Sequence, residues 1–467
     1  MRALKWDTNN GVEVLSMTPQ DDACFATEET LRHIMLDYMQ MTEFVKDPFV
    51  VARADGIRFW DVHGKEYLDG LAGVYVVNVG YNNPRMLEAV RRQLETLPFN
   101  PPMHGTNPRA VELASRLAEI APGDLNTARL VDSGSEANEA AFKMARQYHR
   151  QTGNPGKYKI LSRYLSYHGA TGSAMSAGGV GYRKTLYEPA AVGFLHTYPP
   201  YCYRCPYEKS YPSCETFCAR TIRTMIEWED PRSIAAIIVE PISNTGGIIT
   251  PPMEYLKILR QLCDEFNILL IFDEIITGFG RTGKLFAANT FDVVPDILCC
   301  GKGMSSGYAP LAAALVREKV ARVFWGAPGS EFAHGHTYAG NPVACAAGLA
   351  SIREILDRKL PENAQHVGTH LVKSLESLRS FGIVGDIRGK GLFIGVEFVK
   401  DPVTKTPFPP EVKLGLRIGK QALRNGLLLR FDPHWLAFGP PLIVTEQDID
   451  QMVAILEQSI REVLREL

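Results

Sequence analysis

At 467 residues the chain is too long for one small core, which predicts two or three domains around a substantial interior. A hydrophobic content of 45% with 22% charged residues is ordinary for a globular protein, and a formal net charge of -2 gives no electrostatic basis for binding nucleic acid or an anionic membrane. The N-terminus lacks the apolar core of a signal peptide, and no apolar run approaches the length of a membrane span, so a cytoplasmic protein is expected.

The N-terminal part of the sequence predicts short elements followed by two helices. Apolar residues at positions 31–38 have helical spacing, and residues 59–62 and 66–70 are expected to form two short strands joined by a turn. Amphipathic helices are expected around residues 86–97 and 110–120.

A turn of small residues precedes the next predicted helix. A short strand at 129–131 is followed by Asp-Ser-Gly-Ser-Glu, and helical spacing then runs to about residue 149. Backbone N–H groups at such a helix start are free, and together with the helix dipole they favour an anion. Gly134 permits close approach of the backbone, and Ser135 adds a hydroxyl donor. The motif therefore fits a phosphate-binding turn, although taken alone its default interpretation is an ordinary helix N-cap.

Two further strands lead to polar or aromatic residues. The strand expected at 158–161 is followed by Tyr167 and His168, and a buried strand at 234–239 ends at Glu240. This pattern alone assigns no chemical role to the three residues, and a satisfied hydrogen bond in the core explains His168.

Four cysteines form a cluster with the spacing C-x2-C-x8-C-x3-C: Cys202, Cys205, Cys214 and Cys218. This spacing could close a tetrahedral zinc site or two disulfides. The loop is short and carries Tyr and Pro where a zinc ribbon has hairpin turns, which argues against zinc, and the expected redox compartment argues against disulfides. Reduced cysteines that pack in the loop are the favoured interpretation, and no metal ligand is predicted.

The middle of the chain carries the strongest chemical signal. An apolar run at 268–272, with the length and β-branched content of a buried strand, leads into an Asp-Glu pair that begins at Asp273. A second apolar run at 297–300 leads to Lys302, which stands between two glycines. Each motif alone is more often a helix cap or a loop. Their significance comes from the other motifs, which accompany them in one order along nearly the whole chain.

This combination of motifs resembles the class III aminotransferases that use pyridoxal phosphate (PLP). The match consists of the apolar strand, Asp-Glu, a Thr-Gly-Phe-Gly-Arg-Thr-Gly turn and, further on, Gly-Lys-Gly. The resemblance implies an α/β protein of fold type I, in which a large domain has a mainly parallel central sheet and a smaller α+β domain is formed by the N- and C-terminal segments. The expected boundaries are residues 1–75 for the N-terminal segment, 76–345 for the large PLP-binding domain and 346–467 for the C-terminal small domain.

The resemblance also implies roles for single residues. Lys302 resembles the lysine that carries the cofactor as a Schiff base and moves the substrate proton. Asp273 resembles the carboxylate that pairs with the pyridine nitrogen, which the chemistry needs because the protonated ring acts as an electron sink. Tyr167 is expected to stack on the ring. The other cofactor-binding residues that the resemblance implies are Gly134, Ser135, His168, Glu240, Ile275 and Thr337.

The segment 335–342, Gly-His-Thr-Tyr-Ala-Gly-Asn-Pro, resembles another signature of this family. In the family its threonine donates to the phosphate of the neighbouring subunit's cofactor, so Thr337 implies a homodimer with shared active sites, and a higher oligomer stays open. Asp132 departs from the family pattern. It adds negative charge near the phosphate turn, so its side chain is expected to point away.

The C-terminal part predicts a helix at 341–356 and then the elements of the small domain. These are a strand at 392–398, a helix at 412–425, a strand at 427–430 and a last helix that Thr445 begins as its N-cap.

Two residues are candidates for substrate contacts. In related amine transaminases an aromatic residue at the position of Tyr75 forms a wall of the substrate pocket, and a core tyrosine is the alternative. Arg430 ends a predicted strand, where its guanidinium could bind the carboxylate of a keto acid through two hydrogen bonds. A surface ion pair is the alternative for this arginine.

The sequence therefore predicts a PLP-dependent transaminase that moves an amino group from an ω-amino acid or a primary amine to a keto acid such as pyruvate. An aminomutase and a decarboxylating aminotransferase of the dialkylglycine type share the fold and would keep both Lys302 and Asp273, so the motifs do not separate them. A non-catalytic scaffold is the remote alternative. Such a protein would be free to lose these two residues, and this chain retains both. The amino donor is not identified, because specificity depends on a few pocket side chains.

Overall fold

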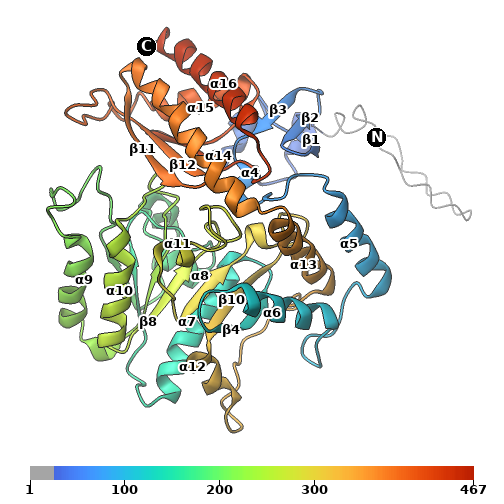
Figure 1. Ribbon diagram of the computed structural model, residues 1–467, viewed down its shortest axis with the longest axis vertical. Coiled ribbons are helices and arrows are strands. Elements are labelled where there is room, and N and C mark those ends of the chain that lie inside the picture. The colour runs from blue at the N-terminus through green and yellow to red at the C-terminus, as the bar shows by residue number, and fades with distance from the viewer. Residues whose placement is uncertain (1–25) are drawn as a thin grey trace, which may run out of the picture. The chain divides into compact units, whose positions relative to one another are not determined.

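The computed structural model describes residues 26–467, which divide into two compact units (Figure 1). Among the described residues, one unit comprises 26–54 and 58–67, and the larger unit comprises 55–57 and 68–467. All the candidate site residues named above belong to the larger unit.

The described part of the smaller unit consists of short elements. They are α2 (Glu28–Leu31), α3 (Met41–Phe44), β1 (Val51–Asp55), β2 (Arg58–Asp61) and the start of β3 (Glu66–Asp69). The two predicted strands are confirmed as β2 and β3, but the prediction of a helix over residues 31–38 is wrong because α2 ends at Leu31. Ile34 and Met35 are 51% and 90% exposed, so no apolar surface stabilises a longer helix.

A seven-stranded sheet forms the centre of the larger unit. Its strands are β4 (Leu125–Val131), β5 (Lys159–Arg163), β6 (Phe194–Thr197), β7 (Ile234–Val239), β8 (Leu269–Asp273), β9 (Ile297–Cys300) and β10 (Ala312–Arg317). The strand order is β4-β10-β9-β8-β7-β5-β6, and β10 runs antiparallel to both of its neighbours whereas β5 to β9 are parallel. The prediction of an α/β fold with a mainly parallel central sheet is confirmed.

Successive residues of the central strands face two different hydrophobic cores. In β8, Leu270 and Phe272 join one core, and Ile271 joins the other. Helix α10 (Met253–Glu265) contributes to the first core and α7 (Gly134–Gln151) to the second (Figure 1). Because both faces of the sheet are covered, these strands appear in the sequence as continuous apolar runs rather than as an alternation.

This part of the described chain also contains eight further α-helices. They are α4 (Ala72–Tyr75), α5 (Pro84–Thr96), α6 (Pro108–Ile120), α8 (Gly172–Ala177), α9 (Phe217–Trp228), α11 (Ala287–Phe291), α12 (Glu318–Ala321) and α13 (Pro342–Asp357). The two predicted amphipathic helices are confirmed as α5 and α6, and both begin with proline after an asparagine N-cap. Among the described residues no helix combines the length and the apolar character needed to cross a membrane.

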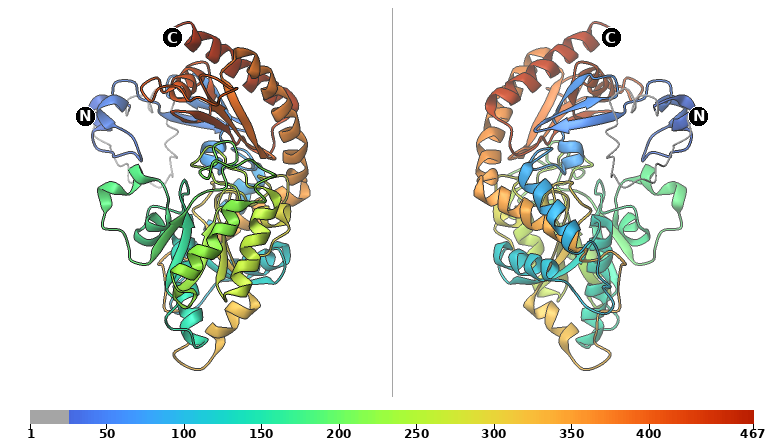
Figure 2. Two further views of the ribbon diagram at one scale, coloured as in Figure 1. Left: turned by 90° about the vertical axis from the view of Figure 1, so that its left-hand side faces the viewer. Right: turned by 90° about the vertical axis from the view of Figure 1, so that its right-hand side faces the viewer.

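The C-terminal part forms a second, antiparallel sheet with the order β11-β12-β15-β14, and its helices α14 and α16 pack against each other (Figure 2). Its elements are α14 (Leu360–Leu375), β11 (Val384–Lys390), β12 (Phe393–Phe398), α15 (Leu414–Arg424), β14 (Arg430–Asp432), β15 (Trp435–Phe438) and α16 (Glu446–Leu464). The prediction of one strand over residues 427–430 is wrong. β13 (Leu427–Leu428) pairs with residues 68 and 69, whereas Arg430 begins β14 in the other sheet, so the chain changes sheets within one apolar run.

The last helix begins with a capping box, as its sequence predicts. The Thr445 hydroxyl accepts from the N–H of Asp448, and the Asp448 carboxylate accepts from the N–H of Thr445 at 2.8 Å. Thr445→Ala removes an acceptor for a helix N–H and is expected to lower the free energy of unfolding by about 1 kcal/mol in a urea titration. Thr445→Ser keeps the hydroxyl and serves as the control. Equal stability of the Ala and Ser variants would contradict the assignment.

Candidate active site

Three strands that are neighbours in the central sheet bring the predicted chemical groups to one edge. Glu240 follows β7, Asp273 ends β8, and Lys302 follows β9. Because the three strands are parallel, their carboxyl ends meet at the same edge of the sheet. The structure therefore places these three titratable side chains in one region.

Asp273 is buried and is held by three hydrogen-bond donors. Its Oδ2 atom accepts from His168 Nδ1 and from Asn138 Nδ2, both at 2.8 Å, and its Oδ1 atom accepts from the N–H of Ile275 at 3.2 Å. Asn138 Nδ2 also donates to the carbonyl of His168 at 2.6 Å, which ties the two donors together. The carboxylate is thus fixed in orientation, and its bond with His168 fixes Nδ1 as the protonated ring nitrogen.

Asn138 is a site residue that the sequence analysis missed. It lies in the first turns of α7 and is fully buried beside alanines. A polar side chain among the small apolar residues of a helix is a signal, because a buried amide needs partners. That signal alone does not identify the partner, which comes from a strand far along the chain.

Glu240 is buried and fixes the backbone next to it in space. Its Oε1 atom accepts from the N–H of Tyr167 at 3.1 Å, and its Oε2 atom accepts from the N–H of Asn244 at 3.2 Å. Burial raises the pKa of this carboxyl, and the nearby Asp273 raises it further. Glu240 therefore positions Tyr167, whose half-buried ring also has the guanidinium of Arg183 4.9 Å from its centroid.

Lys302 occupies a tightly enclosed turn. Its φ angle is +46°, in the left-handed region, and a Cβ atom at Gly301 would lie 3.1 Å from Ala312. A Cβ atom at Gly303 would lie 2.2 Å from Asn78 Nδ2, so the second glycine is required on steric grounds. Burial lowers the pKa of Lys302 to about 8, although the charges of Asp273 and Glu240 act to raise it.

Tyr75 lies beside the lysine. The Nζ atom of Lys302 is 5.8 Å from the centre of the Tyr75 ring, and the tyrosine is 1% exposed. Its hydroxyl has no hydrogen-bond partner among the described residues, and burial raises the pKa of the phenol. Tyr75 is therefore both a core residue and a neighbour of the amine, so the two interpretations of the sequence are compatible.

Two arginines act on this region. Arg430 is half-buried on β14, where its Nη2 atom lies 3.7 Å from Asp432 Oδ2 and its guanidinium carbon lies 5.6 Å from the centre of the Trp435 ring. Arg281 is fully buried, donates to the Asn78 side chain at 2.7 Å, and was not singled out in the sequence. Both positive charges act to lower the pKa of Lys302.

The turn of small residues begins α7 and packs against the strand that carries the aspartate. Ile275 fills the space at Gly134, where a Cβ atom would lie 3.0 Å from its side chain. The Ser135 hydroxyl accepts from the N–H of Ala170 at 3.1 Å. Asp132 stands just before the turn, and burial, followed by the charge of Glu136, raises its pKa to about 6.

Thr337 is not among the residues that this edge of the sheet brings together. It is exposed and lines an open cavity with residues 100–107, 128–130 and 331–336. The lining of that cavity contains none of the side chains at the strand ends.

The four clustered cysteines are free thiols that line one small cavity with Phe217 and Pro252. Among residues 26–467 no group of three or more His, Cys, Asp or Glu side chains is arranged to hold a metal ion. Burial raises the pKa of Cys218 to about 12, which keeps this thiol protonated.

The groups at the strand ends fit PLP. The N–H groups at the start of α7 suit a phosphate, and the fixed carboxylate of Asp273 suits a protonated ring nitrogen. Buried polar atoms remain available, since His168 Nε2 and Asn138 Oδ1 have no hydrogen-bond partner among the described residues. An amine whose pKa is lowered toward neutrality suits the aldehyde of the cofactor.

Known proteins to which this chain is similar belong to one kind of enzyme, the aminotransferases. The model of the family described as Aminotransferase class-III matches residues 41–460. A probable aminotransferase of Mycobacterium tuberculosis is 37% identical over 444 residues, which cover 94% of each chain. A putrescine–pyruvate aminotransferase of Pseudomonas aeruginosa is 34% identical over 90% of this chain and 91% of its own. An adenosylmethionine-8-amino-7-oxononanoate aminotransferase of Geobacter sulfurreducens is 37% identical over 92% and 96%, respectively.

Solved structures agree. An (S)-enantioselective omega-transaminase from Thermomicrobium roseum superposes with a TM-score of 0.91 at 37% identity, covering 95% of this chain and 99% of that one. A PLP-bound amine transaminase from an uncultivated Pseudomonas species gives a TM-score of 0.88 at 35% identity, covering 92% and 98%. The chain therefore belongs to the class III aminotransferases, PLP-dependent enzymes of fold type I.

Proposed function

We propose that this aminotransferase moves an amino group from a primary amine or an ω-amino acid to a keto acid such as pyruvate. The observation that carries the proposal is that the Lys302 amine lies 5.8 Å from the centre of the Tyr75 ring and within reach of the charges of Asp273 and Arg430. The similarity to a putrescine–pyruvate aminotransferase and to an omega-transaminase supports the same class of substrates.

In this proposal the residues at the strand ends hold PLP. Gly134 and Ser135 would bind its phosphate, Asp273 would pair with its ring nitrogen, and Tyr167 would cover one face of the ring. His168, Glu240 and Ile275 would support these groups through the contacts described above. When bound, the cofactor supplies an electron sink for the charge that develops at the substrate carbon.

Lys302 would carry out the proton transfer at the substrate carbon. An ammonium group cannot accept a proton, so the lysine must be neutral when it acts as a base. Because its pKa lies near 8, a useful fraction of the amine is neutral close to physiological pH. The same neutral amine is required to capture the aldehyde of the cofactor.

Arg430 would bind the carboxylate of the keto acid. Its present contact with Asp432 is loose at 3.7 Å, and a guanidinium can form two parallel hydrogen bonds with a better-placed carboxylate. Tyr75 would form an apolar and aromatic wall of the pocket. An amine without a carboxylate would leave Arg430 with Asp432, so one pocket could accept both kinds of substrate.

We also propose a homodimer in which Thr337 meets the cofactor phosphate of the neighbouring subunit. Thr337 is exposed and stands apart from the strand ends of its own chain, which suits a contact across an interface. The oligomeric state is measured by light scattering, and a monomeric enzyme with full activity would contradict this part of the proposal.

Lys302→Ala is expected to abolish turnover and to leave the fold intact, because the substitution removes both the anchor and the base. Purified wild-type enzyme should show the visible absorbance of bound PLP. That band should bleach when a suitable amine is added without keto acid and should recover with pyruvate. Circular dichroism of the variant checks the fold, and steady-state transamination by Lys302→Ala would refute the assignment.

The same amine panel separates the rivals of the same fold. An aminomutase would release product without a second substrate, whereas a transaminase needs a keto acid for a second turnover. A decarboxylating aminotransferase would release carbon dioxide. We expect diamines or arylalkylamines to bleach the band without keto acid. We also expect continued turnover to require a keto acid and to release no carbon dioxide.

The pKa of Lys302 predicts a pH dependence. Burial disfavours the ammonium form, so the amine should lose its proton near pH 8 rather than near 10.5. The rate at which the apoenzyme binds PLP should rise with pH and reach half of its maximum at about pH 8. Arg430→Gln removes a positive charge that lowers this pKa, so the midpoint should move to higher pH.

Arg150→Gln is the matched control for that charge change, because Arg150 is exposed near the end of α7. Its midpoint should equal that of the wild type. A wild-type midpoint near the ordinary lysine pKa would show that burial does not act on Lys302 as described.

A further inference from the structure

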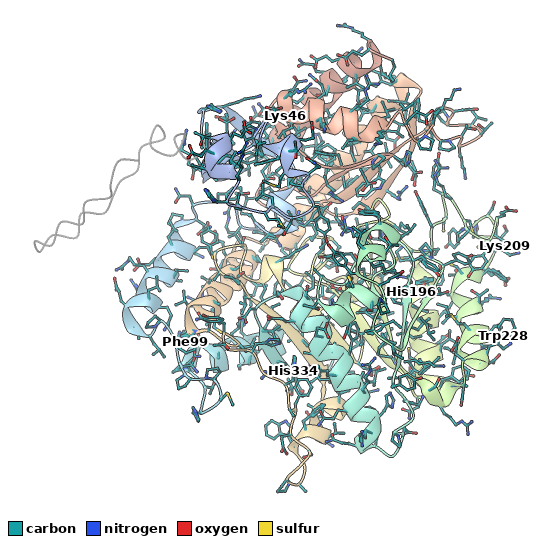
Figure 3. All side chains as sticks on the ribbon, turned by 180° about the vertical axis from the view of Figure 1, so that it is seen from behind. Lys46, Phe99, His196, Lys209, Trp228 and His334 are labelled. Atoms are coloured by element: carbon teal, nitrogen blue, oxygen red, sulfur yellow. The ribbon has the colours of Figure 1, made fainter. Side chains whose placement is uncertain are left out.

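A chain of four polar side chains connects helix α7 with the segment that carries Thr337. Lys143 Nζ lies 3.0 Å from His334 Nδ1, and His334 Nε2 lies 3.1 Å from His336 Nε2. The Nδ1 atom of His336 then lies 3.6 Å from Glu136 Oε1. Figure 3 shows His334 beside α7. The chain thus begins and ends on one helix and passes through two histidines of the segment 331–337.

The two ends of this chain lie on one face of the helix. Glu136 and Lys143 are seven residues apart, which is two turns, and Gln147 follows one turn later. Gln147 Nε2 donates to the carbonyls of Ser330 at 3.3 Å and of Glu331 at 3.0 Å. The segment therefore lies along α7, and it reaches the start of the helix beside the phosphate turn.

Only one direction of hydrogen bonding satisfies all four groups. Lys143 has donors and no acceptor, so His334 Nδ1 must accept and its Nε2 must carry the proton. The Nε2–H group of His334 donates to His336 Nε2. The proton of His336 therefore lies on Nδ1, which faces the Glu136 carboxylate. Both imidazoles are therefore neutral.

The charges around the chain agree with this assignment. Burial, Lys143, His336 and Arg129 all lower the pKa of His334, to about 4, and Glu139 opposes them. The side chain of Arg129 also donates to the carbonyl of His334 at 2.7 Å. Glu136 is tied to the backbone of the turn, because its Oε2 atom accepts from the N–H of Asp132 at 2.8 Å.

We propose that His334 and His336 are positioning residues that hold the Thr337 segment against α7 of their own chain, and so set the affinity with which Thr337 binds the phosphate group of the neighbouring subunit's cofactor. The inference rests on the proposed function, in which each cofactor phosphate is bound by the turn at Gly134 of one subunit and by Thr337 of the other. The histidines touch neither cofactor nor substrate in this scheme. They act through the threonine and through Glu136.

The experiment compares two ligands of the apoenzyme, PLP and phosphate-free pyridoxal. His334→Phe keeps an aromatic ring of similar size and breaks both hydrogen bonds. PLP affinity should fall about tenfold, a loss of about 1.4 kcal/mol that is typical of a broken polar contact, while pyridoxal affinity stays unchanged. The ratio of the two affinities therefore reports the phosphate end alone.

Two further variants sharpen the test. His334→Gln retains an acceptor and a donor on one side chain and should restore most of the PLP affinity. Thr337→Val should lower the same ratio, and adding His334→Phe to it should cost little more, because both changes act on one contact. Arg150→Ala changes an exposed residue of α7 that takes no part in this series of polar contacts. It should leave the ratio of PLP affinity to pyridoxal affinity unchanged.

The outcomes separate this inference from the proposed function. If wild-type apoenzyme does not bind PLP more tightly than pyridoxal, the proposed phosphate site fails. If the wild type does so but His334→Phe leaves the ratio unchanged, or weakens both ligands equally, the positioning role is overturned. Full additivity of His334→Phe and Thr337→Val would also overturn it.

Discussion

The buried carboxylate of Asp273 is the constraint on which the rest of the site depends. A buried charge is costly unless donors surround it, and here His168, Asn138 and a backbone N–H supply them. Those donors come from α7 and from the loop after β5, so satisfying one carboxylate fixes three parts of the fold against each other.

The sheet makes this arrangement possible because it is covered on both faces. Alternate residues of β8 and β9 pack into opposite cores, which holds the ends of these strands in place. Glycines then allow close approach at two points. Gly134 packs on Ile275 and Gly301 packs on both Ile275 and Ala312, which couples the phosphate turn to the lysine through one isoleucine.

Two opposing sets of effects act on the pKa of Lys302. Asp273 and Glu240 favour positive charge on Lys302, whereas burial and the guanidinium groups of Arg281 and Arg430 favour the neutral amine. The balance leaves a nucleophilic and basic amine close to neutral pH, which an aminotransferase needs. Arg430 has a loose acidic partner in Asp432. In the proposed function this arginine would meet substrates with and without a carboxylate in turn.

The sequence by itself determined the family, the cofactor and the parallel sheet, because buried strands, Asp273 and Lys302 are separate local patterns that occur in one order. It did not determine the partners of those residues. Asn138 and Arg281 gain their roles from segments far along the chain, and only tertiary packing decides which distant acceptor a buried donor meets. The change of sheet between Leu428 and Arg430 and the end of α2 at Leu31 were hidden for the same reason, since local apolar spacing does not specify the surface it packs against.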